Sequence, residues 1–207
     1  MSTSPRKIGI LIFNGVEELD FVGPFEVFGM SNEVFSLQGK AVPDKLILIS
    51  EDGQPIVGAK GMKFIPDASI NDIDALDVLL IPGGQGTRRE MTNNALLEWV
   101  IKISETATWV TSVCTGALVY AAAGLTHGKR ITTHWGALEL LAEIDSKANV
   151  LSHRRYVRDG NLVTAAGVSA GIDMALWLTG QRYTPEHARN TQKAMEYDPA
   201  PPYSADV

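Results

Sequence analysis

Short apolar runs that alternate with helical segments constrain the fold of this chain more than any other feature of its sequence. The runs expected to form strands are residues 7–13, 45–50, 77–81, 108–113, 131–133 and 162–166. The segments expected to form helices are residues 17–29, 94–105, 115–124, 135–143, 169–183 and 185–197. Strands as apolar as these are covered on both faces, which is typical of parallel sheets. The pattern therefore predicts an α/β fold of the flavodoxin-like kind, a three-layer sandwich in which helices cover both faces of a mainly parallel sheet.

The length and the connecting segments predict a single domain over residues 1–207. Domains commonly have about 100–200 residues, and this chain contains no internal repeat, low-complexity block or linker that would divide it. The Gly-rich residues 53–61 are expected to contain a hairpin. Residues 198–207 are too rich in Pro to continue a helix or a strand.

Charge and hydropathy exclude several classes of protein. The net charge of −6, from 18 basic and 24 acidic residues, provides no basic surface for nucleic acid. No apolar run approaches the roughly 20 residues that cross a bilayer, and no apolar signal region precedes Lys7. A single cysteine cannot form an internal disulfide, which agrees with a reducing compartment. We therefore expect a cytoplasmic protein with neither nucleic acid nor a membrane as partner.

The only thiol of the chain lies at a junction that this fold class uses for ligands. Ligands bind beyond the carboxyl ends of parallel strands, which selects residues 14–20, 82–87 and 114–116. Cys114 follows an expected strand and precedes an expected helix, so a sharp turn there would expose the sulfur. The amides and dipole of the helix N-terminus favour a thiolate, and we expect a nucleophile with a lowered pKa. The alternative is a small buried apolar side chain.

Residues 82–86, Pro-Gly-Gly-Gln-Gly, follow another expected strand and have few bulky side chains. The amides of such a loop approach a developing oxyanion closely, although a Gly-rich turn without any ligand has the same sequence. A dinucleotide-binding G-x-G-x-x-G motif that begins at Gly84 needs a sixth-position Gly, where the chain has Arg89. A nucleotide cofactor is therefore not expected.

Carboxylates and histidines supply the remaining candidates. Glu17, Glu18 and Asp20 follow the first strand, where a carboxylate either meets the thiol and a water or merely caps the helix. His134 is a candidate base for a Cys–His pair, and an ordinary hydrogen-bonded histidine is the alternative. The four histidines lack HxH and HxxxH spacing, and there is one cysteine, so no metal site is expected.

A G-x-S-x-G pattern at residues 167–171 has the form of the nucleophile turn of serine hydrolases. That function requires an acid and then a histidine further along the chain. Only Asp173, on the same expected helix, and His187 occur in this order. We expect Ser169 to cap the start of the helix instead.

Seven segments in the same order along the chain together resemble the ThiJ/PfpI superfamily. They are residues 19–24, 81–84, 110–116, 128–135, 157–162, 170–173 and 196–202. The resemblance implies a fold like that of class I glutamine amidotransferase domains, and a homodimer. Within the superfamily the residues are most similar to the isonitrile hydratases. Thr-Thr-His-Trp and the Cys-x-Gly pattern also resemble the ligand domains of some AraC-type transcription regulators.

The resemblance implies roles for four residues. Cys114 takes the position of the nucleophile, and Asp20 that of the acid that contacts the thiol and the water. Thr115 matches the residue after the nucleophile, and Gly84 the glycine whose amide faces the bound group. PfpI-type peptidases have His at the position of Thr115, and members with deglycase or chaperone activity have Glu at the position of Asp20. Both departures favour the hydratases.

The implied activity is a lyase reaction, the addition of water to isonitriles to give N-substituted formamides, without a metal or other cofactor. We expect an apolar pocket for the substituent near Val16, Phe21 and Trp135. Two alternatives remain open. One is another activity of the superfamily, such as a glyoxalase or a redox-sensing thiol. The other is a ligand-binding module related to AraC-type regulators, whose helix-turn-helix region we do not expect within the ten residues after Tyr197.

Overall fold

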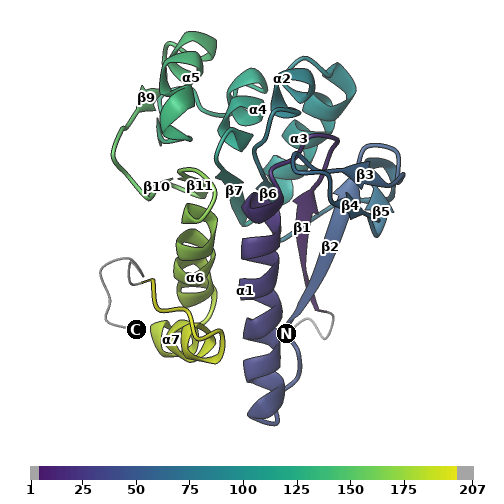
Figure 1. Cartoon of the computed structure of the whole chain (residues 1–207), viewed down its shortest axis with the longest axis vertical. Coiled ribbons are helices and arrows are strands. Elements are labelled where there is room, and N and C mark those ends of the chain that lie inside the picture. Colours follow the sequence, from purple (N-terminus) through teal and green to yellow (C-terminus); the bar gives the residue numbers. More distant parts are fainter. Residues whose placement is uncertain (1–4, 200–207) are drawn as a thin grey trace.

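A seven-stranded sheet organises residues 5–199, the part of the chain that the computed structural model describes (Figure 1). The strands lie in the order β10-β11-β7-β6-β1-β2-β5. Their bounds are β1 (Arg6–Leu11), β2 (Asp44–Ser50), β5 (Ala68–Ser69), β6 (Val78–Ile81), β7 (Trp109–Val113), β10 (Tyr156–Asp159) and β11 (Leu162–Ala165). All neighbouring strands are parallel except β10 and β11, so the predicted mainly parallel sheet is confirmed.

Two small ribbons lie outside this sheet. Strands β3 (Ile56–Val57) and β4 (Lys63–Phe64) form an antiparallel hairpin, which begins within the expected residues 53–61 and closes beyond them. Strands β8 (Arg130–Ile131) and β9 (Asn149–Val150) form a short parallel pair. The strand expected at residues 131–133 is therefore β8, outside the main sheet.

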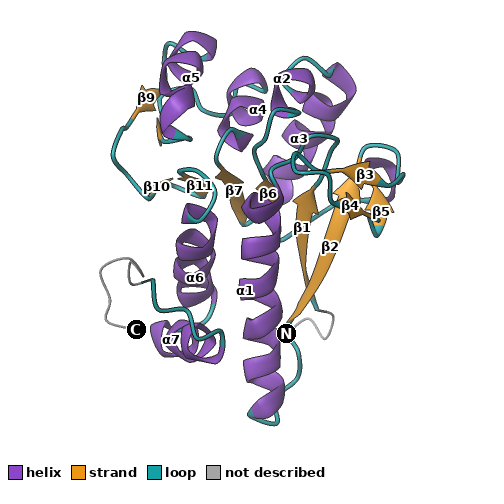
Figure 2. Ribbon diagram, viewed as in Figure 1, coloured by secondary structure: helices purple, strands orange, loops and turns teal. Residues whose placement is uncertain are grey.

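Helices cover both faces of the sheet, as the flavodoxin-like prediction requires (Figure 2). Helices α1 (Glu18–Leu37), α6 (Ala170–Arg182) and α7 (Pro185–Ala194) pack against one another. The second group has α4 (Gly116–Ala122) in contact with three other helices, α2 (Thr87–Glu90), α3 (Asn94–Thr106) and α5 (Leu138–Ile144). Two single 3-10 turns, η1 (Ile70–Asp72) and η2 (Trp135–Ala137), complete the elements.

Some elements differ from the expectation for local physical reasons. Helix α1 continues to Leu37 because its second half is also buried: Val34 is buried, and Ser31 bonds to His187 of α7. Strand β10 has no counterpart among the expected strands, since its sequence YVRD belongs to a half-exposed edge strand rather than an apolar run. The helix expected at residues 135–143 is divided into η2 and α5. Residues 200–207 of the Pro-rich tail lie outside the described residues.

The loops that the sequence analysis selects follow the central strands of the sheet. Strands β1, β6 and β7 are neighbours and parallel, and the side chains of β6 are fully buried. Their carboxyl ends therefore bring residues 14–20, 82–87 and 114–116 together at one edge of the sheet. Among residues 5–199, no helix combines the length and the apolar character that crossing a membrane requires.

Candidate active site

Cys114 occupies a sharp turn between β7 and α4. Its φ is 54°, in the left-handed region that residues other than Gly rarely adopt. Its amide donates to the carbonyl oxygens of Ala165 (3.1 Å) and Ala166 (3.0 Å), and its carbonyl oxygen accepts from Thr133 Oγ1 at 2.6 Å. These three bonds hold the turn in its unfavourable conformation. The expected strand-to-helix turn is thus present, but only 6% of the Cys114 surface is exposed.

Asp20, in the first turn of α1, is the carboxylate that meets the sulfur. It is fully buried, and its side chain lies close enough to the Cys114 thiol for each group to shift the pKa of the other. Its Oδ2 accepts from the amide of Gly83 at 2.8 Å, and its Oδ1 accepts from the amide of Val168 at 3.1 Å. Burial raises the pKa of Asp20 from 3.8 to about 7, and the Gly83 amide and the Cys114 thiol offset part of that rise.

The electrostatics of Cys114 correct the expectation of a lowered pKa. Burial, and after it the negative charge of Asp20, raise the pKa of the thiol to about 12. The amides of Thr115 and Val168 act in the opposite direction, as the start of a helix is expected to do. Their contribution is outweighed because the sulfur is shielded from water and faces a carboxylate. The resting side chain is therefore a thiol.

Asp20 and Cys114 titrate as a pair. Between pH values of about 7 and about 12, the pair holds one proton, on the sulfur, and one negative charge, on Asp20. Near neutral pH the carboxyl group is close to half-protonated, so it can both accept and donate a proton. The arrangement suits proton transfer during nucleophilic attack rather than ionisation before it.

The loop after β6 places two glycines against the turn that holds Cys114. A Cβ atom at Gly83 would lie 2.5 Å from the Thr115 amide nitrogen and 2.8 Å from Asp20 Oδ2, so a side chain does not fit there. The amide of Gly84 donates to Thr115 Oγ1 at 3.0 Å. The donor expected to face a bound group is therefore occupied by the Thr115 hydroxyl.

Thr87 supports this contact and is absent from the sequence candidates. Its hydroxyl is fully buried, 3.1 Å from Thr115 Oγ1 and 2.8 Å from the Gly84 carbonyl oxygen. Arg88 Nη1 lies 3.2 Å from the same hydroxyl. A threonine at the beginning of a helix usually caps it, so the sequence carries no signal that Thr87 fixes its neighbours across the loop.

The other two carboxylates at the start of α1 contact the β3–β4 hairpin instead. Glu17 Oε2 pairs with Lys60 Nζ at 2.7 Å, and Glu18 Oε1 accepts from the Lys60 amide at 2.6 Å. Both fasten the hairpin to the first turn of the helix. Of the three carboxylates that the sequence offers, Asp20 is the one that shifts the pKa of the thiol.

His134 lies at η2 and has another hydrogen-bond partner. Its Nδ1 accepts from the amide of Gly136 at 3.1 Å, which leaves the proton of the neutral ring on Nε2. A Cβ atom at Gly167 would lie 2.3 Å from His134 Cδ2, so the ring packs directly on the loop before Val168. This geometry does not support His134 as a base for Cys114, because the nitrogen that would accept a proton is occupied.

The G-x-S-x-G segment does not form a hydrolase triad. Ser169 stands at the N-cap position of α6, as expected, although its Oγ contacts Arg155 at 3.4 Å rather than the helix amides. Asp173 Oδ2 accepts from Arg155, and the ring of His187 bonds to Ser31 Oγ at 2.8 Å on α1. Within residues 5–199, no three His, Cys, Asp or Glu side chains gather in a way that would hold a metal ion.

A cleft of about 640 Å³ adjoins the site, between residues 132–138, 152–155 and 166–168. Thr133 and Val168, which bond to Cys114 and Asp20, form part of its wall. Trp135 also lines it, as expected for a substituent pocket. Val16 and Phe21, expected beside Trp135, are instead fully buried in the core, and they do not line this cleft.

Comparison with known proteins extends the similarity over most of the chain. Residues 6–181 match the model of the DJ-1/PfpI family. The chain is 37% identical to an isonitrile hydratase of Pseudomonas putida over 200 residues, 96% of this chain and 82% of that protein. It is 27% identical to the HTH-type transcriptional regulator GbdR of Pseudomonas aeruginosa (strain UCBPP-PA14), over 93% of this chain and 50% of the regulator. The crystal structure of a ThiJ/PfpI family protein from Pseudomonas syringae matches with a TM-score of 0.86 and 30% identity, over 99% of this chain and 80% of that one.

Proposed function

The chain belongs to the DJ-1/PfpI family, and from that premise we propose that it hydrates isonitriles to N-substituted formamides with Cys114 as nucleophile. One arrangement carries the proposal: a buried thiol lies against a buried carboxyl group that two backbone amides hold in place and whose pKa is raised to about 7. Such a pair delivers a proton and a nucleophile to the same atom. The identity of 37% to an isonitrile hydratase supports the choice of substrate class.

In the first step, Sγ of Cys114 bonds to the terminal carbon of R–N≡C. The thiol proton passes to Asp20 and from Asp20 to the same carbon, which gives the neutral thioimidate R–N=CH–S–Cys114. The reaction needs no thiolate in the resting enzyme, in keeping with the raised pKa of Cys114. Because the pKa of the thiol is well above that of Asp20, the proton leaves the sulfur as the carbon–sulfur bond forms, and Asp20, with a pKa of about 7, then donates it to the carbon.

In the second step, water adds to the thioimidate carbon. Asp20 accepts a proton from the water and passes it to the nitrogen, which gives R–NH–CH(OH)–S–Cys114. The carbon–sulfur bond then breaks, the hydroxyl proton returns to the sulfur through Asp20, and R–NH–CHO leaves. The sum is one isonitrile plus one water to one formamide, with the enzyme restored.

Thr115 and Gly84 supply hydrogen-bond donors in this proposal. At rest they are bonded to each other, with the Gly84 amide 3.0 Å from Thr115 Oγ1. When the Thr115 hydroxyl turns toward the substrate, the amide is released as well. The two groups then donate to the nitrogen and oxygen of the adduct, where electron density increases.

The test follows formamide formation from an aromatic isonitrile after exhaustive chelation and desalting of the purified protein. We expect turnover that survives chelation and is lost in Cys114→Ala. Activity that persists in Cys114→Ala, or returns only with added metal, contradicts the mechanism. Methylglyoxal is assayed in parallel, and turnover of methylglyoxal alone would replace the hydratase with a glyoxalase.

The pH dependence tests the role of the carboxyl group. The pKa of Asp20 is about 7, so kcat/KM is expected to rise with pH as the carboxylate that accepts the thiol proton forms, and to level off above that value. Initial rates measured at low substrate concentration from pH 5 to pH 9 give the profile. A rate independent of pH over this range contradicts the assignment of Asp20.

The similarity to the regulator GbdR favours a second candidate, a module that binds a small molecule without converting it. The same assay separates the two functions. An isonitrile that binds reversibly and yields no formamide supports the binding module.

A further inference from the structure

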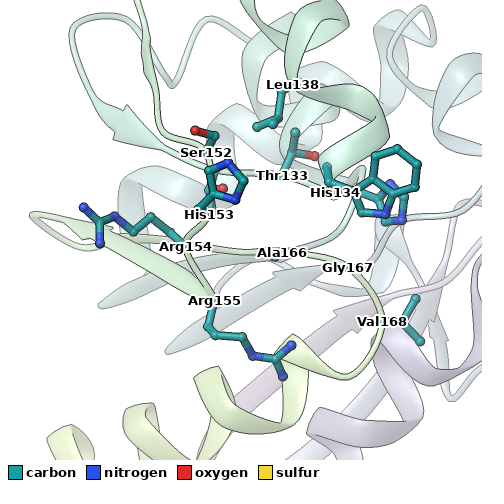
Figure 3. A pocket seen from close by; sticks show the side chains of 12 residues that line it. Thr133, His134, Leu138, Ser152, His153, Arg154, Arg155, Ala166, Gly167 and Val168 are labelled. Atoms are coloured by element: carbon teal, nitrogen blue, oxygen red, sulfur yellow. The ribbon is translucent and has the colours of Figure 1, made fainter.

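The cleft beside the site has the size of a small-molecule pocket and a cationic wall. Its volume of about 640 Å³ falls within the range of roughly 300–1,000 Å³ that is common for ligand sites. In Figure 3, His134 and His153 lie on opposite sides of Thr133, and Arg154 extends outward at the rim. The twelve residues that line it include two histidines and two arginines but no aspartate or glutamate.

The absence of acidic side chains from this wall contrasts with the net charge of −6 of the whole chain. Arg155 is neutralised by Asp173, with its Nε 2.7 Å from Oδ2. In the part of the chain that the structure describes, no carboxylate pairs with the neighbouring Arg154, so its charge faces solvent at the rim. A lone guanidinium above a concave surface attracts anions and binds carboxylates in a bidentate manner.

Flat and hydrogen-bonding groups complete the wall. The indole of Trp135 lines the cleft and is 81% exposed, so one face of it is available for stacking. His134 accepts a bond at Nδ1 and therefore presents Nε2–H as a donor. Leu138 adds an apolar side chain. Together these groups match a ligand with a flat apolar body and one negative charge.

A ligand in this cleft contacts the same backbone that holds the reactive pair. The Val168 amide donates to Asp20 Oδ1 at 3.1 Å, and the Thr133 hydroxyl donates to the Cys114 carbonyl oxygen at 2.6 Å. Because these bonds join the wall of the cleft to Asp20 and Cys114, we expect a bound ligand to alter the position or the mobility of both residues.

We propose that this cleft binds a small organic anion with a flat apolar body, for which an aromatic carboxylate is the simplest example. Two sources of that chemistry are possible. In the first case the anion is the substituent of the isonitrile itself, and this case rests on the proposed function. In the second case the anion is a separate ligand that changes the activity of the neighbouring site. The binding chemistry is the same in both.

The first experiment measures binding and needs no catalysis. Benzoate is titrated into the protein by isothermal calorimetry, with benzamide as the uncharged match. Benzoate is expected to bind more tightly than benzamide, and Arg154→Gln to weaken benzoate by about fivefold, the effect of one exposed charge pair. The control Arg189→Gln removes an exposed arginine of α7 that does not line the cleft, and leaves the affinity unchanged. Absence of benzoate binding, or equal affinity for benzamide, overturns the inference even if isonitriles are hydrated.

The second experiment distinguishes the two sources by comparing 4-isocyanobenzoate with its methyl ester. If the anion is part of the substrate, the carboxylate has the lower KM, Arg154→Gln abolishes the difference, and benzoate inhibits competitively. If the anion is a separate ligand, both compounds have similar KM values and benzoate changes kcat. If neither compound is hydrated while benzoate binds as expected, the proposed function fails and the inference stands. An effect of benzoate that Arg154→Gln does not alter assigns the anion to another site and overturns it.

Discussion

Two buried aspartates lie near opposite ends of the neighbouring strands β1 and β2, and their carboxylates have different partners. Asp20 follows the carboxyl end of β1, and Asp44 begins β2 at the other end of the sheet, opposite Arg6. Both are almost inaccessible to water, with 0% and 4% of their surface exposed. They differ in the chemistry of their partners.

Asp44 is matched by a full positive charge. Arg182 donates to it through both terminal nitrogens, at 2.7 and 2.8 Å, and the Tyr183 hydroxyl donates at 2.6 Å. Asn32 adds contacts to the backbone of Asp44. These contacts join the start of β2 to the end of α6.

Asp20 has only dipoles for partners, two backbone amides and a thiol. The two amides replace part of the hydration that the carboxylate loses on burial. Because the rest of this hydration is not replaced, the ionised form is disfavoured and the pKa is raised to about 7. The same residue type at a similar degree of burial therefore pairs with a guanidinium at Asp44, and has a raised pKa at Asp20, where two amides and a thiol are its partners. The predictions below test this difference, beginning with the largest expected effect.

Removing the proton-transfer capacity of Asp20 has the largest expected effect. Asp20→Asn retains the shape of the side chain but cannot carry a proton, so kcat for isonitrile hydration is expected to fall by about 10²–10⁴-fold, with a smaller change in KM. Steady-state kinetics measure both. Glu18→Gln is the matched control, because Glu18 is a buried carboxylate two residues away that contacts the hairpin. Nearly full activity in Asp20→Asn together with loss in Glu18→Gln would show that the wrong carboxylate was chosen.

Removing the charge of Asp44 acts on stability instead. Asp44→Asn leaves a buried guanidinium without its counterion, so the free energy of unfolding is expected to fall by about 3–5 kcal/mol. Urea denaturation measures it. Arg6→Gln is the control, since Arg6 lies 3.7 Å from Asp44 and is 41% exposed, and its loss is expected to cost less than about 1 kcal/mol.

If Asp44→Asn does not fold, Tyr183→Phe tests the same cluster. It removes one hydrogen bond to the carboxylate and is expected to cost about 1.5 kcal/mol. Unchanged stability in both variants would contradict a structural role for the cluster.

Neutralising Asp20 is expected to stabilise the fold, the opposite of the effect at Asp44. The pKa of Asp20 is higher in the folded chain than in the unfolded chain, so its ionisation subtracts stability as the pH rises from about 4 to about 7. Asp20→Asn avoids this loss but gives up one amide bond, so a net gain of about 1–2 kcal/mol is expected at pH 8. At pH 4 the gain is expected to disappear. Urea denaturation at the two pH values measures it, and a loss of stability at pH 8 would contradict the raised pKa.

The smallest expected effect concerns the uncharged support of the site. Thr87→Val keeps the volume of the side chain but removes the hydroxyl 3.1 Å from Thr115 Oγ1, so kcat is expected to fall by about tenfold at nearly constant KM, the equivalent of one hydrogen bond. Thr87→Ser restores the hydroxyl and is expected to restore most of the rate. A defect that serine does not rescue would point to packing rather than positioning.

The sequence predicts the central elements of the fold better than its edges. Residues 78–81 are apolar throughout and are buried on both sides, so their pattern is unambiguous. Strand β10 is mostly not buried and ends in the two charged residues Arg158 and Asp159, and its pairing with β11 is set by contacts that the local sequence does not encode. Helix α1 extends past Gly29 because Ser31 and Val34 contact other parts of the chain.

The residues of the candidate site also differ in how well the sequence identifies them. Cys114 is found from the sequence because it is the only thiol and follows a strand. Asp20 is one of three carboxylates after the first strand, and only the resemblance to the family selects it. Val168 contributes only its backbone amide, which any residue except Pro provides, so no sequence pattern identifies it. The sign of the pKa shift at Cys114 also escapes prediction, because it depends on burial and on a carboxylate distant in the chain.

The backbone of Val168 has a consequence for attempts to engineer this protein. Its φ is 50°, a conformation that a β-branched residue adopts at a cost of about 1–3 kcal/mol and that glycine adopts freely. A thermostability selection on random libraries is therefore expected to enrich glycine at position 168. The same replacement loosens the amide that faces both Asp20 and Cys114. Val168→Gly is therefore expected to raise stability and to lower activity. A screen for stability alone is expected to select this replacement.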